Sequence, residues 1–203
     1  MAALRIETFS GSDLARMLPA LARLRMRVFR EWPYLYDGEA AYEEDYLAGF
    51  GAARTAGLVV AFDGDTAVGC SSCVGLAEES AALRMPFEAR GIDPGRVFYF
   101  GESVLLAAYR GRGVGVGFFA ARETHARRVS DCDFAAFCAV MRPAAHPLKP
   151  AGAVPLDGFW RRRGFVPYPD MIARLAWKQV DTPGAVENAL SFWMKSVSGA
   201  ALP

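Results

Sequence analysis

Apolar residues recur along the first fifty positions with two different periods. From Leu4 to Ser10 they alternate with polar residues, which is typical of a strand. They then return every three or four positions, at Leu14, Leu18, Leu21, Leu24 and Val28, until Pro33 interrupts the pattern. This spacing predicts a strand followed by a helix of about 18 residues, and a similar pattern over residues 39–50 predicts a second helix.

The middle of the chain has the pattern of β structure. Residues 57–76 contain two β-rich runs separated by Asp63-Gly64-Asp65, which predicts a hairpin. Prolines and glycines over residues 77–96 predict a long, partly helical connection. A strand at 97–106, a glycine-rich turn, a helix ending near Val129 and a strand at 133–141 follow. That order predicts a βαβ unit whose two strands are parallel.

The last quarter of the chain adds a long loop and three elements. The loop, residues 142–158, precedes a short basic helix in "FWRRRGF" and two apolar strands, in "MIARLAWKQV" and "NALSFWMKSV". No internal repeat or low-complexity linker divides the chain. We therefore expect an α/β protein with one mixed sheet, folded as a single domain over residues 1–203.

Charge and composition exclude several classes of protein. The chain has 23 Lys+Arg against 22 Asp+Glu and a net charge of +1, so no overall field favours nucleic acid or an anionic membrane. The N-terminus lacks the apolar segment of a secretory signal, and no segment approaches the roughly 18 uninterrupted apolar residues of a membrane span. These features predict a cytoplasmic protein without nucleic-acid or membrane partners.

Cys70 and Cys73 form a C-x-x-C pair within a predicted strand. Side chains three residues apart on a strand point to opposite faces, and no second Cys or His pair stands at zinc-site spacing. We expect these cysteines to be buried structural thiols and the protein to bind no metal.

Four alternating glycines mark the start of the predicted helix after residue 110, in "YRGRGVGVGFF". A glycine turn between a strand and a helix offers free backbone amides beside the positive end of the helix dipole, which suits a phosphate group. The P-loop pattern fails because no Lys-Ser or Lys-Thr follows at the required spacing, and the dinucleotide pattern fails because Val116 or Phe118 occupies its last glycine position. The pattern [QR]-x-x-G-x-[GA] is matched at every fixed position from Arg110 to Gly115.

This turn and the order of elements resemble the GNAT superfamily of acyl-CoA N-acyltransferases. "FWRRRGF" also resembles that family's F-Y-x-x-x-G-F segment. The resemblance implies a GNAT fold, with a mixed central sheet, helices on both faces and a strand 97–106 that splays from its parallel neighbour. It implies that coenzyme A is bound by Val104, Leu105, Leu106, Arg110, Gly111, Arg112, Gly113, Val114 and Gly115. The pyrophosphate would lie on the amides from Arg112 to Gly115, with charge from Arg110 and Arg112.

Glu102 is the candidate catalytic base. It lies a few residues before the acyl-binding segment, in a region where many GNAT proteins place a catalytic or substrate-binding carboxylate. Its apolar neighbours would raise its pKa toward a useful value. A substrate-orienting or structural role for this carboxylate stays open.

One residue departs from the family pattern. The tyrosine that often protonates the leaving thiolate is replaced by Trp160, so this step would fall to Tyr99, Tyr168, another hydroxyl or water. His125, at the edge of an apolar helical stripe, is interpreted as a packed histidine. The acceptor pocket is expected among residues 30–38, Glu78-Glu79 and the loop 142–158, where aromatic and charged groups gather.

The resemblance therefore predicts an N-acetyltransferase that moves an acetyl group from acetyl-CoA directly to a primary amine of a small molecule or peptide, without a metal. A binding protein of the same fold, or an enzyme that uses a longer acyl-CoA, are the alternatives. The sequence does not identify the amine, and it leaves a homodimer open.

Overall fold

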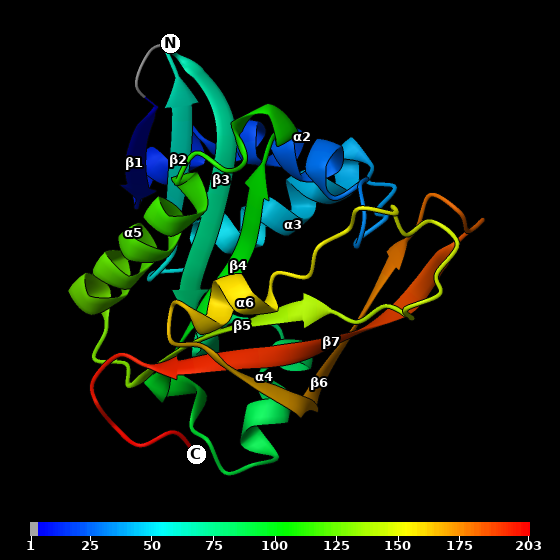
Figure 1. The fold of residues 1–203 in the computed structure, drawn as a ribbon. Coiled ribbons are helices and arrows are strands. Elements are labelled where there is room, and N and C mark those ends of the chain that lie inside the picture. Colours follow the sequence, from blue (N-terminus) through cyan, green and yellow to red (C-terminus); the bar gives the residue numbers. More distant parts are fainter. Residues whose placement is uncertain (1–3) are drawn as a thin grey trace.

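A computed structural model describes residues 4–203 and arranges all the predicted strands in one mixed seven-stranded sheet (Figure 1). The strand order is β1-β2-β3-β4-β5-β7-β6. The strands are β1 Arg5–Ser10, β2 Gly57–Asp63, β3 Thr66–Gly75, β4 Val97–Leu105, β5 Phe134–Val140, β6 Val166–Lys178 and β7 Ala185–Ser196. All neighbouring pairs are antiparallel except β4 and β5, which are parallel as predicted.

Helices cover both faces of this sheet. They are α1 Ser12–Ala15, α2 Leu18–Val28, α3 Ala40–Ala52, α4 Ala81–Glu88, α5 Val114–Val129 and α6 Asp157–Arg161, with short 3-10 turns η1 Leu76–Glu78, η2 Pro94–Arg96 and η3 Ala107–Tyr109. On one face α2, α3 and α4 pack over the sheet, and on the other α5 and α6 do so. Cys70 and Cys73 lie in cores on opposite faces, which confirms the prediction for this pair.

The first predicted helix is broken in two, and the prediction of one helix of about 18 residues is wrong. α1 ends at Ala15, α2 starts at Leu18, and Met17 lies between them. Pro19 explains the break, because its ring nitrogen carries no hydrogen to bond the carbonyl four residues earlier. The apolar stripe survives the break, since Leu14, Leu21 and Leu24 are buried in one core.

β4 contains one extra residue relative to β3. Ser71 pairs with Ser103 and Cys73 pairs with Phe100, so two steps on β3 correspond to three on β4. Such a bulge reverses the faces to which the following side chains point. Phe100, before the bulge, faces α5, whereas Val104, after it, faces α2. The bulge therefore places Glu102 on the face covered by α2 and α3.

β4 and β5 separate soon after they meet. Only Val97 to Tyr99 of β4 pair with Phe134 to Ala136 of β5. Figure 1 shows the two strands running in clearly different directions beyond this point. The splay that the resemblance implied is confirmed, and it opens a gap in the hydrogen bonding of the sheet.

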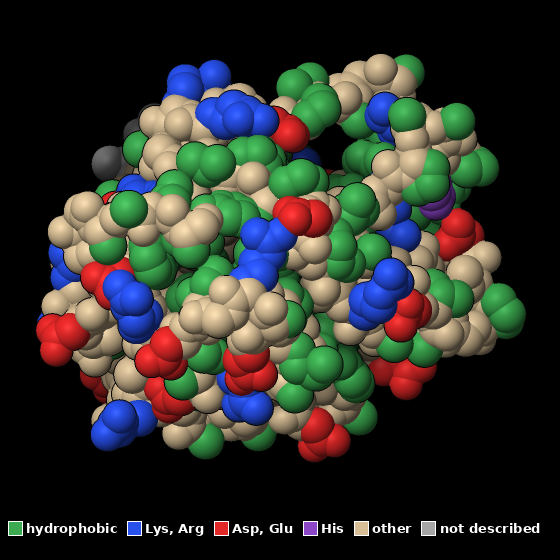
Figure 2. All heavy atoms as spheres, turned by 90° about the horizontal axis from the view of Figure 1, so that it is seen from below, with side chains coloured by type: hydrophobic (Ala, Val, Ile, Leu, Met, Phe, Trp, Pro, Cys, Tyr) green, Lys and Arg blue, Asp and Glu red, His purple; other side chains and the backbone are tan. Residues whose placement is uncertain are grey.

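The surface carries no large region of one charge on the face seen from below. Figure 2 shows acidic and basic side chains interspersed with apolar ones over this face. This distribution agrees with the net charge of +1.

Candidate active site

The turn before α5 presents a row of free backbone amides. Among the described residues, the amides of residues 111–115 donate to no protein acceptor, and the first amide bonded at this end of α5 is that of Val116, to Gly113 O at 3.0 Å. Gly111 and Gly113 have φ of 76° and 82°, values that side chains other than glycine's rarely allow. The start of a 16-residue helix also carries partial positive charge. The turn, called the cradle below, therefore has the free amides and the partial charge that suit an anion.

The next two glycines allow close packing. A Cβ at Gly115 would lie 3.2 Å from Phe159 Cζ on α6, and one at Gly117 would lie 2.5 Å from Ile6 Cδ1 on β1. These contacts bring "FWRRRGF" and the first strand against the cradle. The glycines thus divide into two that set the backbone of the turn and two that let neighbours approach.

The two arginines of the turn differ in what they contact. Arg110 forms a salt bridge with Glu31 at 2.8 Å and donates to Leu105 O at 3.2 Å. Arg112 has no salt-bridge partner among residues 4–203, and its guanidinium lies 5.3 Å from the centre of the Tyr109 ring. Arg112 is therefore the cation at the turn that remains free for a ligand.

The end of β4 contributes one amide to the gap between β4 and β5. Leu106 N donates to Val68 O on β3 at 3.0 Å. Because amides alternate sides along an antiparallel strand, the amide of Val104 also faces β3, whereas that of Leu105 faces the gap. Of the three amides from Val104 to Leu106 that were predicted to hold the cofactor, that of Leu105 alone is directed into the gap, and the role of this segment stays a prediction.

Glu102 is buried and surrounded by hydrogen-bond donors. Its carboxylate accepts from Arg25, from Ser72 Oγ and from Tyr46 Oη, the last at 2.9 Å, and its own amide donates to Ser72 Oγ at 2.9 Å. Burial alone would raise the pKa of Glu102, but the Arg25 charge and these hydrogen bonds outweigh burial and hold the pKa below its usual range. The expectation of a raised pKa was wrong, because the partners come from elements far away in the sequence.

Arg25 connects three elements around this carboxylate. It is 8% exposed, and its Nε donates to Glu43 Oε2 on α3 at 2.6 Å while its Nη1 donates to Glu102 on β4. Its guanidinium also lies over the Tyr46 ring, 4.5 Å from the ring centre. The sequence analysis missed Arg25, although a charged residue next to Leu24 on the apolar stripe of the helix was a usable signal.

A hollow of about 230 Å³ lies beside this cluster. It is lined by Tyr46, Gly49, Phe50 and Ala53 of α3, Val74 of β3, and Glu78, Glu79 and Ser80 of the following turn. Glu78 is held by Thr55, whose amide donates to it at 3.2 Å, and by Arg54 N at 2.6 Å. Glu79 accepts only from the neighbouring Ser80 N, at 3.2 Å, among the described residues. Burial, with the Glu102 charge adding to it, raises the pKa of Glu79 to about 7.

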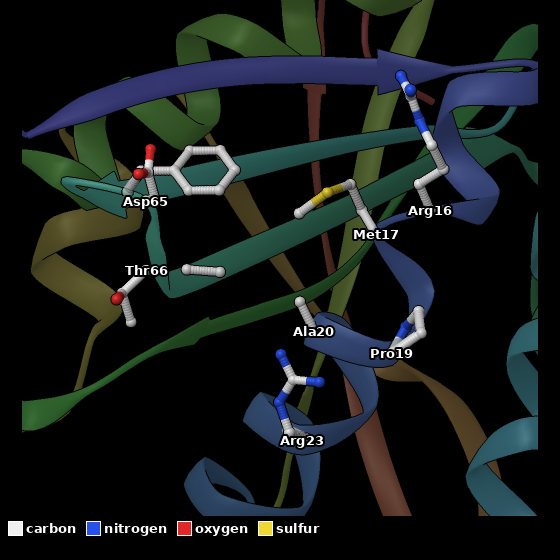
Figure 3. Close-up of a pocket in the computed structure, with 9 residues that line it drawn as sticks. Arg16, Met17, Pro19, Ala20, Arg23, Asp65 and Thr66 are labelled. Atoms are coloured by element: carbon white, nitrogen blue, oxygen red, sulfur yellow. The ribbon is translucent and has the colours of Figure 1, made fainter.

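A larger hollow of about 450 Å³ lies on the other side of α2, against the turn between β2 and β3. Figure 3 shows Arg16, Pro19 and Arg23 on one side of it and Asp65 and Thr66 on the other. It is wide open and lies apart from the Glu102 cluster. The smaller hollow is therefore the better candidate for an acceptor, because its wall includes Tyr46, which contacts Glu102.

Aromatic and thiol groups lie where β4 and β5 separate. Tyr99 Oη and Cys138 Sγ are 3.0 Å apart across the two strands. Burial raises the pKa of Tyr99 well above its usual value, so the hydroxyl keeps its proton. Trp160, in contrast, packs in the core against Phe137 and Trp193.

The long loop after β5 is fastened to the segment after α2. Arg142 donates to Pro33 O at 2.7 Å and to Tyr34 O at 2.9 Å, and the His146 ring lies 5.2 Å from that of Trp32. The structure therefore brings together two of the three segments expected at the acceptor pocket.

His125 is 2% exposed, with Nε2 2.9 Å from Thr55 O, as expected of a packed histidine.

Residues 4–203 contain neither a metal-binding cluster nor a membrane-spanning helix. No group of His, Cys, Asp or Glu side chains in this part of the chain could hold a metal ion, and its four cysteines are free. None of the helices described is long and apolar enough to cross a membrane.

Solved structures similar in fold cover nearly the whole chain. The yncA protein of Salmonella typhimurium, described as a candidate acetyltransferase and solved with its cofactor acetyl-CoA, is 14% identical with a TM-score of 0.62, over 100% of this chain and 98% of that chain. A candidate acetyltransferase of the GNAT family from Desulfovibrio desulfuricans is 14% identical with a TM-score of 0.57, over 97% and 100%. The ribosomal-protein-alanine N-acetyltransferase of Brucella melitensis is 14% identical with a TM-score of 0.57, over 94% and 99%.

No protein-family model matches the sequence, and no curated protein matches it either. At 14% identity, the likeness to these structures shows the fold and does not identify an acceptor. Three features of this chain agree with that architecture: the mixed seven-stranded sheet, the parallel pair that splays and the glycine turn before α5. The chain has the fold of the GNAT acetyltransferases.

Proposed function

We propose that the protein is an N-acyltransferase that moves an acetyl group from acetyl-CoA to a primary amine. The observation that carries this proposal is the row of unbonded amides at residues 111–115, at the start of α5 and beside the gap between β4 and β5. Phosphate groups suit such a helix start, and the gap leaves strand edges for an extended, amide-containing chain. Coenzyme A combines a pyrophosphate with an arm of this kind.

The residues present fit this co-substrate. The amides from Arg112 to Gly115 would hold the pyrophosphate, and Arg112 would add a charge-assisted hydrogen bond. Arg110, with its guanidinium bonded to Glu31 and Leu105 O, would shape the turn more than bind phosphate. The Leu105 amide would meet the arm in the gap. The co-substrate supplies an activated thioester as acyl donor.

Glu102 would act on the acceptor side of the gap. Its carboxylate accepts from Arg25 and orients Tyr46, which lines the smaller hollow, and its low pKa keeps it ionised at neutral pH. We place it as a positioning residue, and its role as the base stays as the alternative that Glu102→Gln tests. Tyr99, a protonated tyrosine at the point of separation, would be the proton donor to the leaving sulfur.

The acceptor would be a primary amine on a small molecule or a peptide. One structural neighbour is named for an alanine of a ribosomal protein, which supports a peptide or protein amine. A binding protein without turnover is a second candidate, favoured by Trp160 in the core where the family often has a tyrosine. Thiol release from acetyl-CoA in the presence of amines separates the two.

Binding of coenzyme A tests the first step of this proposal. We expect CoA and acetyl-CoA to raise the Tm of the protein, and pantetheine, which lacks the pyrophosphate, to do so far less. Arg112→Ala should weaken CoA binding by roughly tenfold, the value of one charge-assisted hydrogen bond, and should leave pantetheine binding unchanged. Titration calorimetry measures both.

Arg127→Ala is the matched control, because Arg127 is an exposed cation near the other end of α5. It should bind CoA as the unchanged protein does. Equal loss of CoA affinity in the two variants would show that general charge, and not the turn, attracts the ligand. Absence of any CoA binding would refute the proposed function.

A further inference from the structure

Glu79 is a half-buried carboxylate that forms no ion pair among the described residues. It directly follows η1, the turn after the end of β3, and lines the 230 Å³ hollow together with the aromatic rings of Tyr46 and Phe50. No Lys, Arg or His among residues 4–203 forms a salt bridge with it, and its single hydrogen bond is the 3.2 Å contact from Ser80 N. Its remaining carboxylate oxygen accepts from no donor among the described residues, so this carboxylate is free for a ligand at the wall of the hollow.

The other carboxylates of the cluster are already engaged. Glu102 accepts from three side chains, Glu43 from Arg25, and Glu78 from Thr55 and the Arg54 amide. An incoming ammonium group would have to displace these donors at Glu102 and Glu78, and Glu43 is fully buried, so its unpaired Oε1 is out of reach. At Glu79 one carboxylate oxygen accepts from no donor among the described residues.

We propose that Glu79 is the general base of the acyl transfer, which binds the acceptor as an ammonium ion in the hollow and removes its proton. This inference rests on the proposed function and names the residue that prepares the acceptor. The rings of Tyr46 and Phe50 would contact the carbon atoms next to the nitrogen. The acceptor class is therefore a primary amine that arrives charged and carries apolar carbon beside the amine.

The steps balance in atoms and charge. An N–H proton of the ammonium moves to a Glu79 carboxylate oxygen, which leaves a neutral amine with a lone pair. That nitrogen forms a C–N bond to the thioester carbonyl, and the C–S bond breaks. Tyr99 gives its proton to the leaving thiolate and regains one from the nitrogen, which loses its second proton. Glu79 then returns its proton to solvent, so the net products are an amide, a thiol and one proton.

The charges around Glu79 suit this task. Glu102 and Tyr46 face it from β4 and α3, and the Glu79 charge in turn raises the pKa of Tyr99 on β4 and Cys138 on β5. Helix α4, which starts just after it, has no charged residue in its first turn, and Arg84 of that helix is directed at Ala77 O and Glu88. A base with a pKa of about 7 is half ionised at neutral pH and still accepts a proton readily.

The test is the pH profile of kcat/KM for thiol release from acetyl-CoA, with phenethylamine, spermidine, lysinamide and a short alanine-initiated peptide as probe amines. The unchanged protein should show a rising limb with a midpoint near 7, where Glu79 loses its proton. In Glu79→Gln this limb should be absent, and kcat/KM at neutral pH should be lower by roughly 10²- to 10⁴-fold. Its rate should recover toward high pH, where the amine is neutral without a base.

Two further variants make the assignment specific. Glu88→Gln removes an exposed carboxylate from the neighbouring α4 and should keep the rate and the limb. Glu102→Gln should move the limb to lower pH, because the charge that helps to raise the pKa of Glu79 is gone.

Each remaining outcome decides the question. A limb retained in Glu79→Gln overturns the inference, and a limb lost in Glu102→Gln at the same time makes Glu102 the base. CoA binding without thiol release from any probe amine refutes turnover, and the inference falls with it. Loss of CoA binding in the unchanged protein instead refutes the proposed function itself.

Discussion

Two glutamates in one cluster show how surroundings decide the properties of a single residue. Glu102 is buried with an arginine and two hydroxyl donors, and its pKa is lowered. Glu79 is half-buried without a cation partner among the described residues, and its pKa is raised. The sequence pointed to Glu102 as a site carboxylate, but it could not give the sign of its pKa shift. Arg25 lies 77 positions away, and only the packing of α2 on β4 brings the two together.

The raised pKa of Glu79 has a cost for stability that a variant should reveal. An acid whose folded-state pKa of about 7 exceeds its ordinary value of 4.5 favours folding below pH 4.5, and this contribution is lost as the pH rises through 7. Compared with the unchanged protein, Glu79→Gln should have the same Tm at pH 4.5. At pH 8.5 its free energy of unfolding should be larger by about 1–2 kcal/mol, which raises the Tm by roughly 2–6 °C. Differential scanning calorimetry at both pH values measures this, and a lower Tm at pH 8.5 would contradict a strained carboxylate.

At the scale of elements, local patterns were sufficient where neighbours in sequence set the structure. The hairpin of β2 and β3, the helix ending at Val129 and the parallel pair β4 and β5 all follow from apolar period and turn residues. The break at Met17 and the bulge in β4 do not follow from these local patterns. Gly101 in the middle of a strand was the available signal for the bulge, and a Cβ there would lie 2.5 Å from Ser72 Oγ.

The cradle before α5 depends on backbone conformation more than on space. A Cβ at Gly113 would meet no atom within 4 Å, yet its φ of 82° is unfavourable for alanine. Gly113→Ala should destabilise the protein by about 1–2 kcal/mol and weaken CoA binding. Gly49→Ala is the matched change, because that Cβ also meets open space but lies within α3, where alanine should stabilise by about 0.5–1 kcal/mol. Denaturant unfolding measures both, and equal shifts would show that φ is not the cause.

At the scale of the whole molecule, the order of elements was enough for the fold class, and the long-range geometry was not. The mixed sheet and the helices on both faces follow the sequence prediction, whereas the acceptor hollow forms from α3, β3 and the turn after it, which no local pattern joins. The single domain, the acceptor and the site residues remain predictions that the experiments above address.

The gap between β4 and β5 leaves few contacts between the two halves of the sheet. Three parallel pairs, at Val97 to Tyr99, join the two halves of the sheet. CoA bound in the gap should slow amide hydrogen exchange of Ser103, Leu105 and residues 111–115, because it would cover amides that do not face β3 or another protein acceptor. Exchange in β1 and β2, which pair along their whole length, should not change. Mass spectrometry of exchanged peptides reads this out, and uniform protection across the sheet would argue against a ligand in the gap.

The bulge in β4 also restricts how this chain can vary. Side chains alternate along a strand, so removing Ser103 would restore even pairing with β3 and turn Glu102 toward α5, the face of Phe100. Removing Gly101 would restore the same pairing and leave Glu102 on the face of Val104. Exchange of one apolar residue for another along this strand is a smaller disturbance than a change in its length. The number of residues in β4, and not the identity of its carboxylate alone, therefore decides whether Glu102 can meet Arg25 and Tyr46.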